Sequence, residues 1–291
     1  MDWLIEPFEL GFQQRALIGG ALASVGLSLV GTWVVVRGMT FLGDALVHGV
    51  IPGIALAVLL EFNVLVGAAL AAVVMIVGIN LVHRQTTFTE DTSIGLLFVG
   101  MLALGVILIS RTTSYQGSLT GILFGDALGV TIDDIVALAA VAISTLVAIL
   151  LFYRPFLVLS FNDQKAQLLG FRPRLSHGLM LALITLTIVA SFQTVGTLLV
   201  FGLLVGPPST AALLARRLPS IMVVSIAIGV FSVAAGLVIS YHLNVSGSAA
   251  MAGLPIVLFF LVLALRSAFE VRKRGGIGEQ AAAPIEVPVD G

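Results

Sequence analysis

The sequence predicts an all-α integral membrane protein, a polytopic bundle of about nine transmembrane helices. Of its 291 residues, 59% are hydrophobic and only 10% are charged, whereas water-soluble domains carry roughly 25% charged residues. The mean hydropathy is +1.15. Apolar runs of about 20 residues recur along the chain, and each is long enough to cross a hydrocarbon core of about 30 Å as a helix.

The apolar runs give nine expected spans. The sixth and seventh runs are nearly fused, joined only by the polar step from Gln193 to Gly196, so a bundle of eight spans is the alternative. We prefer nine, at residues 15–36, 41–60, 64–82, 92–110, 133–152, 177–195, 197–215, 220–241 and 249–266.

Charge and cysteine content exclude several classes of function. The chain has 14 basic and 15 acidic residues, so it lacks the basic excess of a nucleic-acid-binding protein. It has no cysteine, which excludes disulfides and thiolate metal sites and leaves oxygen and nitrogen atoms as metal ligands. The first 14 residues lack the basic start of a signal peptide, so we expect the first span to be retained.

The basic residues predict the orientation in the membrane, because cytoplasmic loops are enriched in Lys and Arg. The loop at residues 153–176 is therefore expected in the cytoplasm, since its charged residues include Arg154, Lys165, Arg172 and Arg174 against Asp163. We expect residues 1–270 to form one membrane domain. Residues 271–291 are rich in Gly and Ala and are expected to form a disordered cytoplasmic tail.

Asp44 and His48 are the ionisable pair that the second span carries. Four residues apart, they lie on one face of a helix. Ionisable groups within a span are costly and tend to face a bundle interior or a water-filled path. A carboxylate with an imidazole suits Mn²⁺, Fe²⁺ or Zn²⁺. The alternative is a hydrogen-bonded pair that only stabilises the bundle; we favour the functional interpretation.

Pro52 strengthens this interpretation, because a proline cannot donate to the carbonyl four residues earlier, here that of His48. We therefore expect a kink and a freed carbonyl beside the pair. Gly43, Gly49 and Gly53 would allow neighbouring helices to approach closely. Two ligands are too few for a closed metal site, but a two-fold dimer would supply two Asp and two His.

Two further segments draw attention. Pro207 and Pro208 are expected to interrupt the seventh span, as broken helices line the pathway of many transporters, although plain structural kinks are also common. In the basic loop, Asp163 can cap a short helix that Gly170 ends, with Ala166 and Leu169 on an apolar patch. This helix could contact a cytoplasmic partner or rest on the membrane surface.

The segment Gly43-Asp44-Ala45-Leu46-Val47-His48-Gly49-Val50-Ile51-Pro52-Gly53 resembles the signature of the metal-uptake ABC-3 family, the permeases of manganese, zinc and iron ABC importers. The likeness continues, in the same order, through residues 123–126, 163–170, 195–196 with 203–211, and 236–244, and covers about residues 10 to 266.

This resemblance implies a fold like that of type II ABC importers, in a multi-pass protein of the bacterial cell membrane. It implies a non-catalytic permease, paired with a second permease copy and a cytoplasmic ATP-binding subunit, and supplied by an extracytoplasmic metal-binding protein. It also implies that Asp44 and His48 contact the transported Mn, Zn or Fe ion, with no permanently bound cofactor, and that residues 163–170, including Asp163, Ala166, Leu169 and Gly170, couple the permease to the ATPase.

No Gly-rich phosphate-binding sequence ending in Lys and Ser or Thr occurs in the chain, so another chain is expected to hydrolyse ATP. The main alternative is a gradient-driven secondary transporter of a metal or another solute, with Asp44 and His48 as a proton relay. An intramembrane metalloenzyme is disfavoured, because the chain lacks cysteine and any His-Glu-x-x-His sequence.

Overall fold

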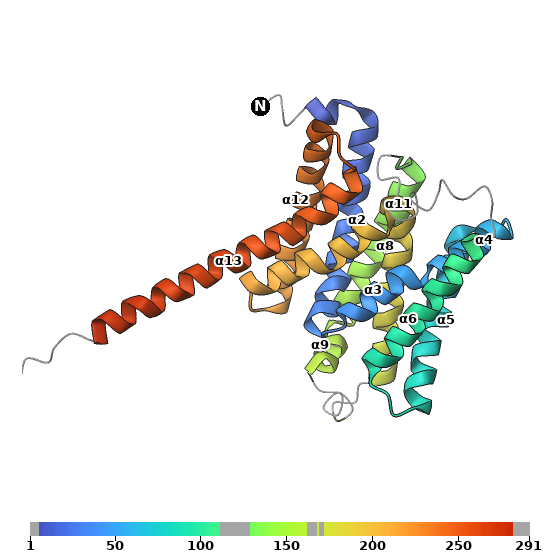
Figure 1. The fold of residues 1–291 in the computed structure, drawn as a ribbon, viewed down its shortest axis with the longest axis horizontal. Coiled ribbons are helices and arrows are strands. Elements are labelled where there is room, and N and C mark those ends of the chain that lie inside the picture. The colour runs from blue at the N-terminus through green and yellow to red at the C-terminus, as the bar shows by residue number, and fades with distance from the viewer. Residues whose placement is uncertain (1–5, 111–128, 162–167, 169–171, 282–291) are drawn as a thin grey trace, which may run out of the picture.

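The computed structural model describes residues 6–110, 129–161, 168 and 172–281. The helices lie in a bundle from which one long helix extends (Figure 1). In chain order the elements are η1 (Glu6–Glu9), α2 (Gly11–Val36), α3 (Thr40–Gly49), α4 (Ile51–Leu59), α5 (Val64–Gln85), α6 (Glu90–Ser110), α8 (Ile132–Leu151), α9 (Tyr153–Phe161), α11 (Pro173–Leu214), α12 (Leu218–Leu243) and α13 (Gly247–Ala281).

Within the described ranges, nine helical segments are long and apolar enough to cross a membrane. The preferred count of nine is thereby confirmed. The helices α3 and α4 together make one span, Thr40–Leu59, and α11 supplies two, Leu175–Phe192 and Val195–Leu214. The first span begins at Gly11, a turn earlier than expected, because its apolar pattern tolerates Gln13, which is buried against the bundle.

Polar side chains fix where some helices begin. The Asn63 side chain accepts the N–H of Leu65 at 2.8 Å and so caps α5. At the start of α8, the Thr131 hydroxyl accepts the N–H of Asp134 at 3.2 Å, and the Asp134 carboxylate accepts the N–H of Thr131 at 3.0 Å. Such reciprocal capping supplies partners for N–H groups that a helix leaves unbonded.

The bundle is built around α2, which packs against α8, α11 and α12. The four least hydropathic spans, which are α2, the α3–α4 span and the two halves of α11, are also the four most buried ones. The more hydropathic helices α5, α6, α8 and α13 are mostly exposed, and α12 is half-buried. The outer surface of the bundle is thus more apolar than its interior, as expected of a protein that lipid, and not water, surrounds.

Glycines set the closest helix contacts around the α3–α4 span. The backbones of Gly53 in α4 and Gly67 in α5 touch, so that a Cβ on either residue would collide with the carbonyl of the other. Gly49 lies against Met75 of α5, and Gly43 lies against Leu204 of α11. These contacts confirm the expectation that Gly43, Gly49 and Gly53 allow close approach, as small residues do in membrane bundles.

The break in α11 lies at Gly196 and not at the two prolines. Gly196 has φ 80° and ψ 163°, whereas Pro207 and Pro208 lie inside the helical half that ends at Leu214. The expectation that the prolines interrupt this span was therefore wrong. Both prolines are buried, and Pro208 packs on Gly31 of α2. The carbonyl of Leu204, to which Pro208 cannot donate a hydrogen bond, also lies beside Gly31.

Two expectations concern segments at the limits of the description. Helix α13 continues to Ala281, so the tail expected from residue 271 begins inside a helix; residues 282–291 lie outside the described part. The coupling residues Asp163, Ala166, Leu169 and Gly170 also lie outside it. The described helix in that loop is α9, at Tyr153–Phe161.

Gly196→Ala should destabilise the protein, because a side chain at this backbone conformation is strained by about 1–3 kcal/mol. Thermal unfolding of the purified protein in detergent would measure the loss. Gly253→Ala is the matched control, since Gly253 is an exposed helical residue with open space at its Cβ position, where Ala favours the helix. Equal melting temperatures for the two variants would contradict the break at Gly196.

Candidate functional site

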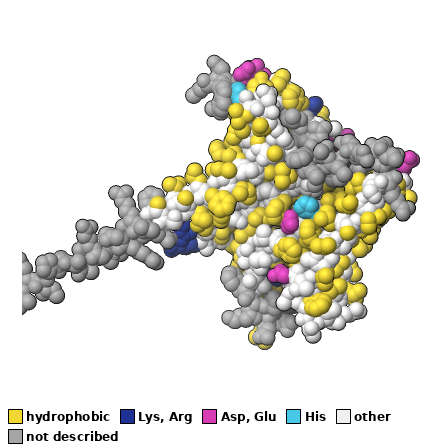
Figure 2. Space-filling model, in the orientation of Figure 1, with side chains coloured by type: hydrophobic (Ala, Val, Ile, Leu, Met, Phe, Trp, Pro, Cys, Tyr) yellow, Lys and Arg dark blue, Asp and Glu magenta, His cyan; other side chains and the backbone are white. Residues whose placement is uncertain are grey.

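Helix α3 brings Asp44 and His48 together, as their spacing predicts. Four residues apart on the helix, the two side chains meet with His48 Nδ1 3.3 Å from Asp44 Oδ1. Figure 2 shows an acidic and a histidine side chain in contact in the middle of a largely apolar face, where Figure 1 draws α3. The pair is thus a polar feature of a surface that is otherwise largely suited to lipid or protein.

The hydrogen bonds of His48 indicate which ring nitrogen carries the proton. Nδ1 lies 3.2 Å from the backbone carbonyl of Asp44 as well as near its carboxylate. Both oxygens are acceptors, so in the neutral ring the proton belongs on Nδ1. The Nε2 atom then has the lone pair, and a metal ion bound there would have a carboxylate orienting its imidazole ligand.

The pair is accessible, with 28% of the His48 side chain and 29% of the Asp44 side chain exposed. A carboxylate facing lipid tails would be costly. This face therefore needs a covering of protein or a water-filled path. Such an opening suits a site that an ion enters and leaves, and it also suits contact with a second copy of the chain.

Phe98 of α6 forms one wall of the site. Its ring meets the His48 ring edge to face, with 6.0 Å between centroids and 87° between planes. Phe41, at the start of α3, packs on the other side of Phe98 at 6.2 Å. The sequence analysis missed Phe98, because the contact joins two separate helices and nothing in the local pattern of α6 marks it.

The expected kink near Pro52 is confirmed. Helix α3 ends at Gly49 and α4 begins at Ile51, with Pro52 in its first turn, where proline is well tolerated. The expectation of a freed His48 carbonyl was wrong, because the N–H of Val50 donates to it. The chain thus bends directly after His48, and the bend supplies a donor for the group that Pro52 cannot bond.

One chain supplies two ligands here. Across the described ranges, no group of three or more His, Cys, Asp or Glu side chains could hold a metal ion. His83 and His177 line a different cavity, and His242 packs on Tyr241 near the end of α12. Completion of the Asp44–His48 site by a second copy therefore stays a prediction, as do the pathway roles of Pro52, Pro207 and Pro208.

The sequence matches the model of the ABC 3 transport family over residues 9–266. The manganese transport system membrane protein MntC of Listeria innocua is 35% identical, over 87% of this chain and 90% of its own length. The manganese import system permease protein ScaB of Streptococcus parasanguinis is 36% identical, over 87% of this chain and 90% of that protein. A probable iron transport system membrane protein of Haemophilus influenzae is 32% identical, over 90% of this chain and 97% of its own length.

Solved structures agree with the fold. PsaBC from Streptococcus pneumoniae in complex with Fab superposes with a TM-score of 0.80 and 31% identity, covering 89% of this chain and 94% of the other. An inward-facing metal-chelate type ABC transporter superposes with a TM-score of 0.71 at 15% identity, covering 87% of this chain and 85% of the other. At this identity the likeness supports the fold alone. From the family match and these relatives, the chain belongs to the ABC 3 transport family.

Proposed function

We propose that this chain is the membrane permease subunit of an ATP-driven importer, which moves a divalent transition metal ion (Mn²⁺, Zn²⁺ or Fe²⁺) across the bacterial cell membrane. The observation that carries the proposal is the Asp44–His48 pair at 3.3 Å on α3, in a chain of the ABC 3 transport family. The permease itself completes no chemical reaction.

The ligand chemistry supports a transition metal as cargo. An imidazole nitrogen and a carboxylate oxygen are borderline ligands that suit Mn²⁺, Fe²⁺ and Zn²⁺, and thiolate-seeking Cu⁺ is a poor match. Relatives of this chain carry the names of manganese and iron transport proteins. With the proton on Nδ1 of His48, the ring is ready to bind an ion through Nε2 without first losing a proton.

The open face of the pair supports a site shared between two permease copies. Two copies related by a two-fold axis would place two Asp44 and two His48 side chains around one ion, which is a sufficient set of ligands. The same arrangement would cover the exposed carboxylate with protein. The site must still bind weakly, since a tightly held ion would not be released.

Energy for transport would come from a cytoplasmic ATP-binding subunit, and metal from an extracytoplasmic metal-binding protein. The loop at residues 163–170 would dock into the ATPase and transmit its closure and opening to the permease halves, which alternate between outward and inward openings. A gradient-driven transporter is the alternative, and membership of the ABC 3 transport family favours the ATP-driven one.

Asp44→Asn and His48→Gln should each reduce metal uptake at least tenfold, because each removes one ligand or its orienting partner. The measurement is uptake of Mn²⁺, Zn²⁺ and Fe²⁺ in competition, by cells that make the permease with its ATPase. Asp133→Asn, an exposed acidic residue at the start of α8, is the control and should transport normally. Unchanged uptake in both pair variants, at equal membrane expression, would leave the pair a structural role.

Leu169→Glu and Gly170→Glu should abolish co-purification of the ATPase with the permease, because a charge at an apolar docking surface opposes its burial. Asp44→Asn should keep the ATPase bound while uptake is lost. The two phenotypes would thus separate docking from ion passage. Full ATPase retention in both loop variants would contradict the coupling role, and ATP-independent uptake would favour the gradient-driven transporter.

A further inference from the structure

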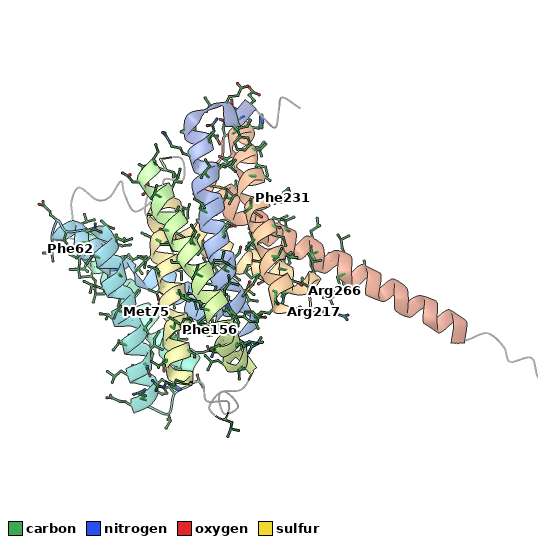
Figure 3. The ribbon with its side chains drawn as sticks, turned by 180° about the vertical axis from the view of Figure 1, so that it is seen from behind. Phe62, Met75, Phe156, Arg217, Phe231 and Arg266 are labelled. Carbon is green, nitrogen blue, oxygen red and sulfur yellow. The ribbon has the colours of Figure 1, made fainter. Side chains whose placement is uncertain are left out.

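Two cavities adjoin on the side of the bundle formed by α5, α8 and α11. This side faces the viewer in Figure 3, which shows the back of the molecule as drawn in Figure 1. The larger is a mostly apolar groove of about 570 Å³, with Asp134 and Thr185 as the polar residues of its described lining. The smaller, of about 250 Å³, contains polar side chains. Ile76 of α5 and Leu181 of α11 line both cavities, so the groove and the polar cavity share a wall, and together they are called the depression.

The groove has the length of a lipid tail. It follows α5 from Leu65 to Val77 and α11 from Gly178 to Ala190. At about 1.5 Å per residue each stretch is about 18 Å long, which slightly exceeds half of a hydrocarbon core of about 30 Å. Ala and Gly make up five of its sixteen lining residues, Ala182 among them, and the volume of the groove leaves room for one acyl chain.

The polar cavity is suited to an anion. Arg37, Asn80, His83 and His177 line it, and no Asp or Glu is among its described lining residues. The Nη1 of Arg37 contacts the Met180 sulfur at 3.8 Å, which holds the guanidinium against α11. A guanidinium matches a phosphate group, the Asn80 amide can donate, and an imidazole can donate from the nitrogen that carries its proton. A metal ion would be repelled by Arg37.

We propose that this depression is a binding site for an anionic phospholipid, with the phosphate headgroup in the polar cavity and one acyl chain in the groove. The polar cavity lies at the end of α2 and α5 where Arg37 and Arg84 are found, the end that the positive-inside rule places in the cytoplasm. Basic pockets between transmembrane helices at that surface suit anionic headgroups.

The lipid would bind away from the Asp44–His48 face. Figure 2 shows the face with the acidic and histidine side chains, and Figure 3 shows the opposite side. Met75, next to Ile76 of the groove, packs against Gly49 at the end of α3. The lipid would therefore contact the helix that supports the end of α3, without blocking the ion ligands. The site does not depend on the proposed function.

The test uses the purified full-length permease in detergent, titrated with phosphatidylglycerol or with phosphatidylcholine of the same acyl chains, with bound lipid counted by native mass spectrometry. Phosphatidylglycerol should bind about tenfold more tightly than phosphatidylcholine, because both lipids carry the phosphate but the quaternary ammonium of choline would be repelled by Arg37. Arg37→Gln should abolish this preference, and Ala182→Phe, which fills the exposed groove, should weaken both lipids.

Matched controls are Arg217→Gln, which removes an exposed basic residue at the start of α12, and Ala264→Phe, on the exposed face of α13. Both should bind lipid like the wild type. If Arg37→Gln fails to fold, as judged by its melting temperature, His177→Gln and Ala182→Phe carry the test. Equal binding of the two lipids to the wild type would overturn the proposal.

Two other occupants would also overturn the proposal. If inorganic phosphate competes with phosphatidylglycerol as well as the lipid itself does, the polar cavity is an anion site without a lipid tail. If Ala182→Phe instead dissociates a permease dimer and leaves phosphatidylglycerol binding unchanged, the groove is an interface between copies. Selective loss of phosphatidylglycerol in the Arg37 and Ala182 variants supports the site.

Discussion

Close backbone contact at glycine is the constraint on which the rest of this structure depends. In a bilayer, apolar side chains gain little from leaving lipid for a helix partner, so association needs tight packing. Leu204 of α11 lies against Gly31 of α2 and also against Gly43 of α3. One residue thus ties the central helix, the helix with the ion ligands and the broken helix together: its backbone carbonyl meets Gly31, where a Cβ would collide with it, and its side chain meets Gly43.

The same constraint positions the chemistry. Gly43 immediately precedes Asp44, and Gly49 immediately follows His48, so the two residues that hold α3 against its neighbours flank the pair. The face of α3 with Leu46, which is fully buried, is turned into the bundle. The opposite face, with Asp44 and His48, is turned outward. The pair is accessible because the glycines fix which face of α3 is buried.

The sequence predicted the local features and missed those that depend on tertiary contacts. Span positions follow from hydropathy, and the meeting of Asp44 with His48 follows from helix geometry alone. Phe98 could not be found, because its contact with His48 joins distant helices. Pro207 and Pro208 were misjudged, since the burial of both prolines and the contact of Pro208 with Gly31 maintain a helix that local rules would break.

The bends at Val50 and Gly196 have a mechanical consequence. Sliding α3 along α11 would bring a residue larger than Gly43 against Leu204, and sliding α4 along α5 would do the same at Gly53 and Gly67, so these contacts oppose translation of the packed helices. A rotation about points where the helices are already interrupted would leave these contacts in place. Val50, two residues after His48, and Gly196, which divides α11, are two such points among the described residues.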